Sequence, residues 1–103
     1  MEKTLIYKKK LRDEMHSEYI LKYSLLIRSG ASGKVYGVEI ERLDAAGICE
    51  IDTLQGVSEK RKEVEHFLSR LWKGGALPVE LAALYDDFIS EKEEDRAVML
   101  PAM

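Results

Sequence analysis

The stretch that decides the fold is Tyr23-Ser-Leu-Leu-Ile-Arg-Ser-Gly-Ala-Ser-Gly-Lys-Val-Tyr-Gly-Val-Glu-Ile-Glu-Arg-Leu-Asp-Ala-Ala-Gly-Ile-Cys-Glu-Ile-Asp-Thr53. It holds two four-residue segments that end in glycine, Gly30-Ala-Ser-Gly33 and Asp44-Ala-Ala-Gly47, with alternating apolar and polar residues around them. Glycine supplies the positive φ that tight hairpin loops need. The stretch therefore predicts three antiparallel strands joined by two tight turns.

The two turns also predict which residues face one another, provided that each turn closes its hairpin directly. The first predicts the pairs Ile27–Tyr36, Leu25–Val38, Tyr23–Ile40 and Lys22–Glu41. The second predicts Leu43–Ile48, Glu41–Glu50, Ile40–Ile51 and Glu39–Asp52. One predicted face is apolar: Tyr23, Leu25, Ile27, Tyr36, Val38, Ile40, Cys49 and Ile51. The other is polar: Lys22, Ser24, Arg28, Glu39, Glu41, Glu50 and Asp52.

Two segments before Tyr23 complete the sheet: the first adds a fourth strand, and the second extends the first strand of the quoted stretch. One covers residues 3–12, where Leu5, Tyr7 and Leu11 point inward and alternate with Ile6 and the basic residues 8, 10 and 12. Lys9 interrupts the inward set, which suits an edge strand protected by a charge. A polar connection over 13–17 then leads into a strand that runs from about residue 18 to 29.

The apolar period changes from 2 to 3.6 after Ser58, a good helix N-cap. Apolar residues at helical spacing predict one amphipathic helix through Val64, Phe67, Leu68, Leu71 and Trp72, which Gly74-Gly75 ends. Pro78 predicts the start of a second helix, whose stripe runs from Leu81 through Leu84, Tyr85 and Phe88 to Ile89 and ends near Glu91. The chain is thus expected to be α+β: a four-stranded antiparallel meander sheet with a C-terminal helical hairpin packed on one face.

Length and composition fit one small domain. The chain has 103 residues, is 46% hydrophobic and 34% charged, and carries a net charge of −3. We expect a single two-layer domain over residues 1–92 and a charged and apolar tail over 93–103 that docks on this domain or on a neighbouring copy. One cysteine, no secretory signal and no apolar run of membrane-spanning length predict a cytoplasmic protein without membrane contacts.

Several segments together resemble a known family. They are Tyr36-Gly-Val-Glu-Ile40, the change to a helix near Ser58, Leu77-Pro-Val-Glu-Leu81 and Asp86-Asp-Phe-Ile89. Over about residues 19–90 they resemble a small uncharacterised family, a domain of unknown function, of clostridia and related Firmicutes. The resemblance implies the same sheet and helical pair in a bacterial cytoplasm, and it implies no reaction, ligand or catalytic residue.

The polar sheet face holds the candidate interaction site. Its members are charged residues of both signs and one leucine: Lys8, Lys10, Arg12, Lys22, Leu26, Arg28, Glu39, Glu41, Glu50 and Asp52. A face that is basic at one edge and acidic at the other suits a two-fold homodimer, or an unknown protein partner, with apolar contacts from Ile6 and Leu26. The alternative is a nucleic-acid-binding module on the basic edge. Nucleic acid is the less favoured partner, because Tyr7, Tyr23 and Tyr36 are expected on the opposite face and stacking platforms need aromatics on the basic one.

Catalytic and metal sites have little support in the sequence. The carboxylates Glu39, Glu41, Glu50 and Asp52 would repel one another in the predicted register, and a hard cation would relieve that repulsion, but a flat sheet face lacks the looped cage typical of Ca²⁺. No nucleophile, base and orienting group occur at a recognisable spacing. We therefore expect no catalytic residue, no metal site and no cofactor, and a chain that is more plausibly a binding module than an enzyme.

Overall fold

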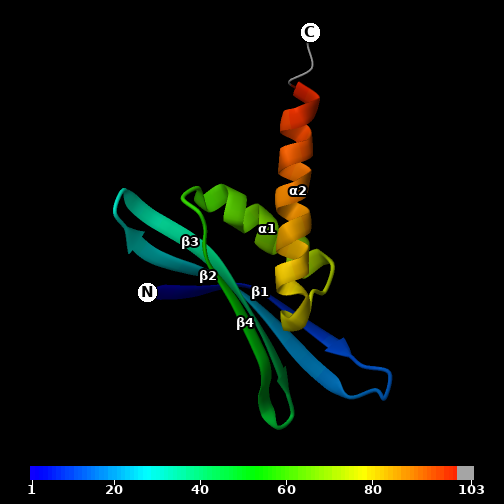
Figure 1. The fold of residues 1–103 in the computed structure, drawn as a ribbon. Coiled ribbons are helices and arrows are strands. Elements are labelled where there is room, and N and C mark those ends of the chain that lie inside the picture. Colours follow the sequence, from blue (N-terminus) through cyan, green and yellow to red (C-terminus); the bar gives the residue numbers. More distant parts are fainter. Residues whose placement is uncertain (100–103) are drawn as a thin grey trace.

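The chain forms a four-stranded antiparallel meander followed by two helices on one face of the sheet (Figure 1). The computed structural model describes the backbone of residues 1–99 and the side chains of residues 1–47 and 50–91. The strands are β1 (Glu2–Arg12), β2 (Glu18–Gly30), β3 (Gly33–Asp44) and β4 (Gly47–Ser58). The helical part consists of α1 (Arg61–Lys73), the 3-10 turn η1 (Pro78–Glu80) and α2 (Leu81–Met99). The predicted α+β fold is confirmed.

The β2–β3 hairpin has the predicted register throughout. Tyr23 lies opposite Ile40, and the pairing continues without interruption from Gly30–Gly33 at the turn to Ile20–Leu43 at the far end. Because side chains alternate along a strand, this register places the central apolar residues of both strands on the face that the helices cover. Leu21, Tyr23, Leu25, Val38 and Ile40 are all fully buried there.

The β3–β4 hairpin departs from prediction one residue beyond its turn. Leu43 does face Ile48, but the next pairs are Arg42–Glu50, Glu41–Ile51, Ile40–Asp52 and Glu39–Thr53, so β4 holds one extra residue at a bulge. The predicted pairs Glu41–Glu50, Ile40–Ile51 and Glu39–Asp52 are therefore wrong. A bulge of one residue exchanges the faces of everything beyond it.

The exchange of faces has two visible results. Ile51 lies on the outer face with Glu41 and is 52% exposed, whereas Glu50 and Asp52 lie on the helix-covered side. The predicted inward position of Cys49 concerns a side chain outside those that the structure describes. The bulge thus removes two carboxylates from the polar face that the sequence predicted.

A second bulge, at Ile6, changes the edge strand β1. The pairs Leu5–Ser24 and Tyr7–Tyr23 leave Ile6 between them without a partner of its own. Ile6 packs against the core, while Leu5 faces outward with 48% of its surface exposed. The predicted positions of these two residues are therefore reversed, and Ile6 adds no apolar contact to the outer face.

Lys9 lies on the inner side of β1, as the sequence predicts, opposite Leu21. Its Nζ donates hydrogen bonds to the carbonyl oxygens of Trp72 (3.0 Å) and Lys73 (3.3 Å). These are among the last carbonyls of α1, which have no partner within the helix and favour a positive charge. The neighbouring ring of Tyr7 stacks on Trp72 at a centroid distance of 4.8 Å. The hydrogen bonds of Lys9 and the stacking of Tyr7 on Trp72 hold the C-terminal end of α1 against the edge strand β1.

The buried core joins the inner sheet face to both helices. Val64, Leu68 and Leu81 are fully buried against the strands. The Tyr23 hydroxyl donates a hydrogen bond of 2.9 Å to the carbonyl oxygen of Ala76, which holds the connection between α1 and η1 over the sheet centre. Burial raises the pKa of Tyr23 well above its ordinary value.

The helix boundaries agree only in part with the sequence. Ser58 ends β4 instead of capping α1, although its Oγ accepts a hydrogen bond from the Lys60 amide (3.0 Å) and donates one to Glu63 (2.7 Å). The Gly74 stop is confirmed, and Pro78 opens the 3-10 turn that precedes α2. The helix α2 runs on to Met99 instead of ending near Glu91, and Figure 1 shows its second half projecting away from the sheet.

Candidate functional site

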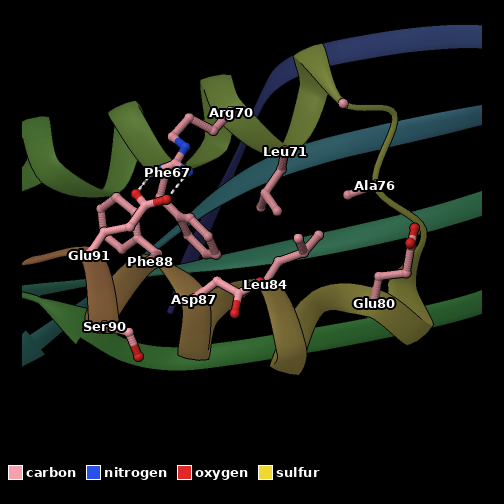
Figure 2. Close-up of a pocket in the computed structure, with 11 residues that line it drawn as sticks. Phe67, Arg70, Leu71, Ala76, Glu80, Leu84, Asp87, Phe88, Ser90 and Glu91 are labelled. Atoms are coloured by element: carbon pink, nitrogen blue, oxygen red, sulfur yellow. Dashed lines mark hydrogen bonds and ion pairs between the residues drawn. The ribbon is translucent and has the colours of Figure 1, made fainter.

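A groove lies between α1 and α2 on the helical face. It encloses about 430 Å³. Figure 2 shows Arg70 and Glu91 at one end, Ala76 and Glu80 at the other, and Leu71 and Leu84 between them. The α1–α2 groove is lined by residues of both helices and their connection: Phe67, Arg70, Leu71, Gly74, Ala76, Glu80, Leu84, Asp87, Phe88, Ser90 and Glu91.

The floor of the groove is apolar because two helical stripes meet there. Phe67 and Leu71 come from α1 at a spacing of four, and Leu84 and Phe88 come from α2 at the same spacing, so each pair lies on one side of its helix. Phe67 packs against the ring of Phe88 at 4.9 Å and against that of Tyr85 at 5.9 Å. Leu84 stays partly exposed in the groove. The aromatic packing gives the floor a fixed shape.

The rim of the groove is charged. Arg70 forms a bidentate pair with Glu91, in which Nη1 bonds Oε2 and Nη2 bonds Oε1 at 3.0 Å (Figure 2). The hydrogen bond from Arg70 lowers the pKa of the Glu91 carboxyl. At the other end, Glu80 Oε1 accepts a hydrogen bond from the Leu77 amide at 2.8 Å. Asp87 adds a further exposed carboxylate. The groove therefore combines an apolar floor with a mainly acidic rim closed at one end by an ion pair.

Three of the polar side chains that line the groove are carboxylates. Its lining contains one hydroxyl, on Ser90, and no histidine or cysteine. Nucleophilic catalysis needs a base within hydrogen-bond reach of the nucleophile and a group that orients the base. Among the described residues, no three His, Cys, Asp or Glu side chains are grouped so as to hold a metal ion. The same part of the chain has no helix that is both long and apolar enough to cross a membrane.

The outer sheet face, opposite the helices, brings together most of the charged residues singled out in the sequence. Alternation from the observed pairs places these residues on it: Lys8, Lys10, Arg12, Lys22, Leu26, Arg28, Glu39 and Glu41. Glu50 and Asp52 are absent from it because of the bulge in β4. Glu50 instead accepts a hydrogen bond of 3.0 Å from Arg42, whose guanidinium lies 4.6 Å from the ring centroid of Tyr19.

The carboxylates of the outer face are bound within the chain. Lys3 Nζ contacts Glu39 Oε2 at 2.9 Å and Glu41 Oε1 at 3.2 Å, and the bond to Glu39 is the main reason that the pKa of Lys3 is raised. Thr53 Oγ1 donates to the other oxygen of Glu39 at 3.3 Å. Sequence reasoning missed Lys3. The signal that could have found it is position. Lys3 lies opposite Leu26 of β2, and Leu26 shares the outer face with Glu39 and Glu41 of β3.

The basic edge is partly neutralised as well. Lys10 and Arg12 share the carboxylate of Glu18, at 3.1 and 3.2 Å, and these contacts lower the pKa of Glu18. Lys8 and Lys22 lie directly opposite each other, and neither forms an ion pair with a described residue. This pair therefore places two like charges side by side on the outer face.

Leu26 offers little of the apolar contact surface expected of it on this face. It is only 4% exposed, lies opposite Gly37, and lines a small hollow together with Val35 and Gln55. Gly37 has to lack a side chain, since a Cβ there would come within 2.3 Å of the Leu54 carbonyl oxygen. Leu5 and Ile51 are exposed large apolar residues of this face, and they lie on the two edge strands.

Comparison with known proteins gives a family and no function. The model of a family of unknown function, DUF6514, matches residues 2–91. The chain belongs to this family. The match confirms the resemblance to an uncharacterised family and includes every residue of the α1–α2 groove. The comparisons with curated proteins and with solved structures gave no match.

Proposed function

We propose that this DUF6514 protein is a non-catalytic homodimerising module and that the α1–α2 groove is its contact surface. The observation that carries the proposal is the combination of a preformed apolar groove with a helix, α2, that continues past the sheet it packs on (Figure 1). The groove offers apolar surface to a partner, and the projecting helix needs a partner to pack against.

The groove is apolar at its centre and charged at its rim, as protein interfaces are. Leu84 remains partly exposed above the buried rings of Phe67 and Phe88, and the charged residues Arg70, Asp87 and Glu91 surround it. Protein interfaces place apolar and aromatic side chains at the centre and polar ones at the edge. A volume of about 430 Å³ is enough to receive several apolar side chains from a partner.

The projecting half of α2 supports a second copy as the partner. An isolated helical segment gains little stability in water from backbone hydrogen bonds alone, and most helices in proteins are stabilised by packing. Figure 1 shows neither the sheet nor α1 beside the C-terminal half of α2. A second copy brings both a groove and an identical helix, so a two-fold pair satisfies both copies at once.

The outer sheet face is a weaker surface for self-association. A dimer of opposite charges on that face needs free carboxylates, but Lys3 binds both Glu39 and Glu41 within the chain. Glu50 binds Arg42 on the other side of the sheet. Exposed ion pairs add little affinity even when they form. The groove therefore has stronger support as the dimer contact.

A nucleic-acid-binding role has one observation in its favour, the facing pair Lys8 and Lys22. Stacking of bases, the main source of sequence-tolerant affinity for single strands, needs aromatic rings on the same face. Tyr23 and Tyr36 lie on the helix-covered face instead. Phosphate contacts without stacking are lost steeply as salt rises. We therefore favour the dimer.

The test is the mass of the protein in solution across a wide range of concentration, by sedimentation velocity. Wild-type chains are expected to dimerise, Leu84→Asp to be monomeric because it puts a charge on the apolar floor, and Leu5→Asp to dimerise like wild type. The last is the matched control, since Leu5 is also partly exposed but lies on the outer face. Circular dichroism checks that each variant is folded. A wild-type monomer at every concentration, or a dimer in Leu84→Asp, overturns the proposal.

A further inference from the structure

The rim of the α1–α2 groove carries an excess of negative charge. Of the described residues that line the groove, Glu80, Asp87 and Glu91 are acidic and only Arg70 is basic. Glu91 binds both Nη atoms of Arg70, so these two charges offset each other. Figure 2 shows Glu80 at the end of the groove away from this ion pair. The rim therefore retains the negative charges of Glu80 and Asp87.

The sequence around the groove extends this acidic character. Residues 77–91 include four carboxylates and no lysine, arginine or histidine. The fourth carboxylate, Asp86, lies on α2 beside Asp87 but does not line the groove. Opposite charges attract and like charges repel across an interface, so the groove favours a positively charged occupant over a neutral or acidic one.

The floor of the groove fits the apolar side chains of a helix. Phe67 and Leu71 of α1, and Leu84 and Phe88 of α2, are each four residues apart, which is about 6 Å along a helix axis. A third helix in the groove repeats this spacing with its own apolar side chains at i and i+4. A helix also pairs its own backbone groups, whereas an extended segment would bring unpaired N–H and C=O groups onto the apolar floor.

The positions of the carboxylates specify where such a helix has to be basic. Glu80 and Asp87 are seven residues apart, so about 10 Å separates them along α2. Two residues seven positions apart lie on nearly the same side of a helix, because seven residues complete almost two turns. A helix that lies along α2 therefore meets both carboxylates when its basic residues are seven positions apart and its apolar residues lie between them. Lysine and arginine suit this arrangement, since their methylene groups pack on apolar surface while their charge reaches the rim.

From the acidic rim and the apolar floor we infer that the α1–α2 groove binds a basic amphipathic helix of another protein, in competition with the second copy. The inference goes beyond the proposed dimer, because it names a different occupant of the same groove. In the proposed dimer two acidic rims face each other, whereas a basic helix brings the opposite charge to the same floor. Added salt is therefore expected to strengthen the dimer and to weaken the complex with the basic helix.

The test uses a labelled synthetic helical peptide as the probe and measures its binding to the chain by fluorescence anisotropy. The basic peptide is built on alanine, with leucines on one face and lysines seven positions apart at the two ends of that face. The control peptide has glutamate at the lysine positions and is otherwise identical. The basic peptide is expected to bind wild type at least about tenfold more tightly than the acidic one.

Substitutions of two adjacent carboxylates locate the contact on the protein. Asp87→Lys is expected to weaken binding of the basic peptide about tenfold, because it replaces an attractive contact by a repulsive one. Asp86→Lys makes the same change of net charge outside the groove lining, so it is expected to change the affinity less than about twofold. Circular dichroism checks that each variant is folded. Asp87→Asn is the substitute if the lysine variant does not fold, with an expected loss of about threefold.

The contribution of the apolar floor is tested separately from that of the charge. Leu84→Asp is expected to abolish binding of the basic peptide even though it adds a negative charge, because the partly exposed part of the floor is then no longer apolar. Binding that Leu84→Asp leaves intact would place the peptide elsewhere on the molecule and would overturn the inference.

Sedimentation velocity in the presence of the peptide distinguishes the inference from the proposed function. Excess basic peptide is expected to convert the wild-type dimer into monomer with bound peptide. A dimer that persists in excess peptide overturns the inference and leaves the dimer proposal intact. Equal affinity for the two peptides, or for Asp86→Lys and Asp87→Lys, also overturns the inference. A wild-type monomer whose binding of the basic peptide depends on Leu84 and Asp87 overturns the dimer proposal and supports the inference.

Discussion

The hairpins β2–β3 and β3–β4 have similar turns and different registers. Both turn segments have four residues and end in glycine, at Gly33 and Gly47, and both place that glycine at a positive φ. The first hairpin keeps one register along its whole length, whereas the second shifts by one residue just after Leu43. A turn therefore determines the pairs next to it, and a bulge farther along can still exchange the two faces of a strand.

The difference decides what each hairpin contributes to the molecule. The regular hairpin supplies the centre of the core, where Tyr23 and Ile40 face each other beneath the helices. The bulged hairpin places Ile51 in solvent and brings Glu50 opposite Arg42. Without the bulge, Glu50 would have faced Glu41, and like charges directly opposite each other are destabilising.

The largest expected effect is a difference in stability between two isoleucine substitutions, one at Ile40 in β3 and one at Ile51 in β4. Ile40→Ala is expected to lower the free energy of unfolding by about 2–5 kcal/mol, because it leaves a cavity in a fully buried site. Ile51→Ala, at a half-exposed site, is expected to change it by less than about 0.5 kcal/mol. Urea unfolding followed by circular dichroism measures both. Similar large losses at the two positions would show that β4 has the unbulged register.

The next effect concerns the hydrogen bond between the β2–β3 hairpin and the connection between α1 and η1. Tyr23→Phe removes the donor to the Ala76 carbonyl oxygen and is expected to cost about 1–3 kcal/mol, because it leaves a buried acceptor without a partner. Tyr36→Phe is the matched control on the neighbouring strand, since Tyr36 is only partly buried. A loss of stability at Tyr36 equal to that at Tyr23 would argue against a special role for the bond to Ala76.

The same tyrosine predicts a dependence on pH. Burial raises the pKa of Tyr23 in the folded state above the 10.0 of an exposed tyrosine, so the folded protein holds this proton more tightly than the unfolded chain does. Its contribution to stability is therefore complete below about pH 10 and is lost progressively as the pH rises above that value. Urea midpoints measured between neutral and alkaline pH are expected to fall more steeply for wild type than for Tyr23→Phe.

The smallest expected effect is the ion pair that the bulge creates. A double-mutant cycle with Arg42→Ala and Glu50→Ala is expected to give a coupling of about 0.2–1 kcal/mol that decreases with added salt, as for other partly exposed pairs. The cycle with Glu41→Ala and Glu50→Ala is the control, because the observed register separates these residues onto opposite faces. Coupling in the second cycle and none in the first would contradict the bulge.

The sequence predicts the helical stripes that line the α1–α2 groove, but it does not predict the groove itself. The apolar spacing of Phe67, Leu71, Leu84 and Phe88 predicts two helices packed on the sheet, but periodicity alone does not show that the two helices leave a groove between them. The outer-face charges were found, but the pairing of Lys3 with Glu39 and Glu41 depends on a side chain that reaches across from another strand.

The sequence by itself determined the elements and their order. Glycine in the turns, alternation at period 2, apolar spacing at period 3.6, the helix stop at Gly74 and the helix start at Pro78 are local signals, and local signals need no knowledge of the rest of the chain. They were sufficient for the meander, for the helix-covered face and for the register of the β2–β3 hairpin.

Only the tertiary structure decided the register shifts in β1 and β4, the hydrogen bonds of Lys9 and the groove. Each depends on contacts between residues far apart in the chain. Ile6 turns inward because the core accepts it, and Lys9 is tolerated on the inner side because the carbonyl oxygens at the end of α1 bind its ammonium group. Such contacts form only when sheet and helices pack together, and their free energy then outweighs the simple alternation that the sequence pattern predicts.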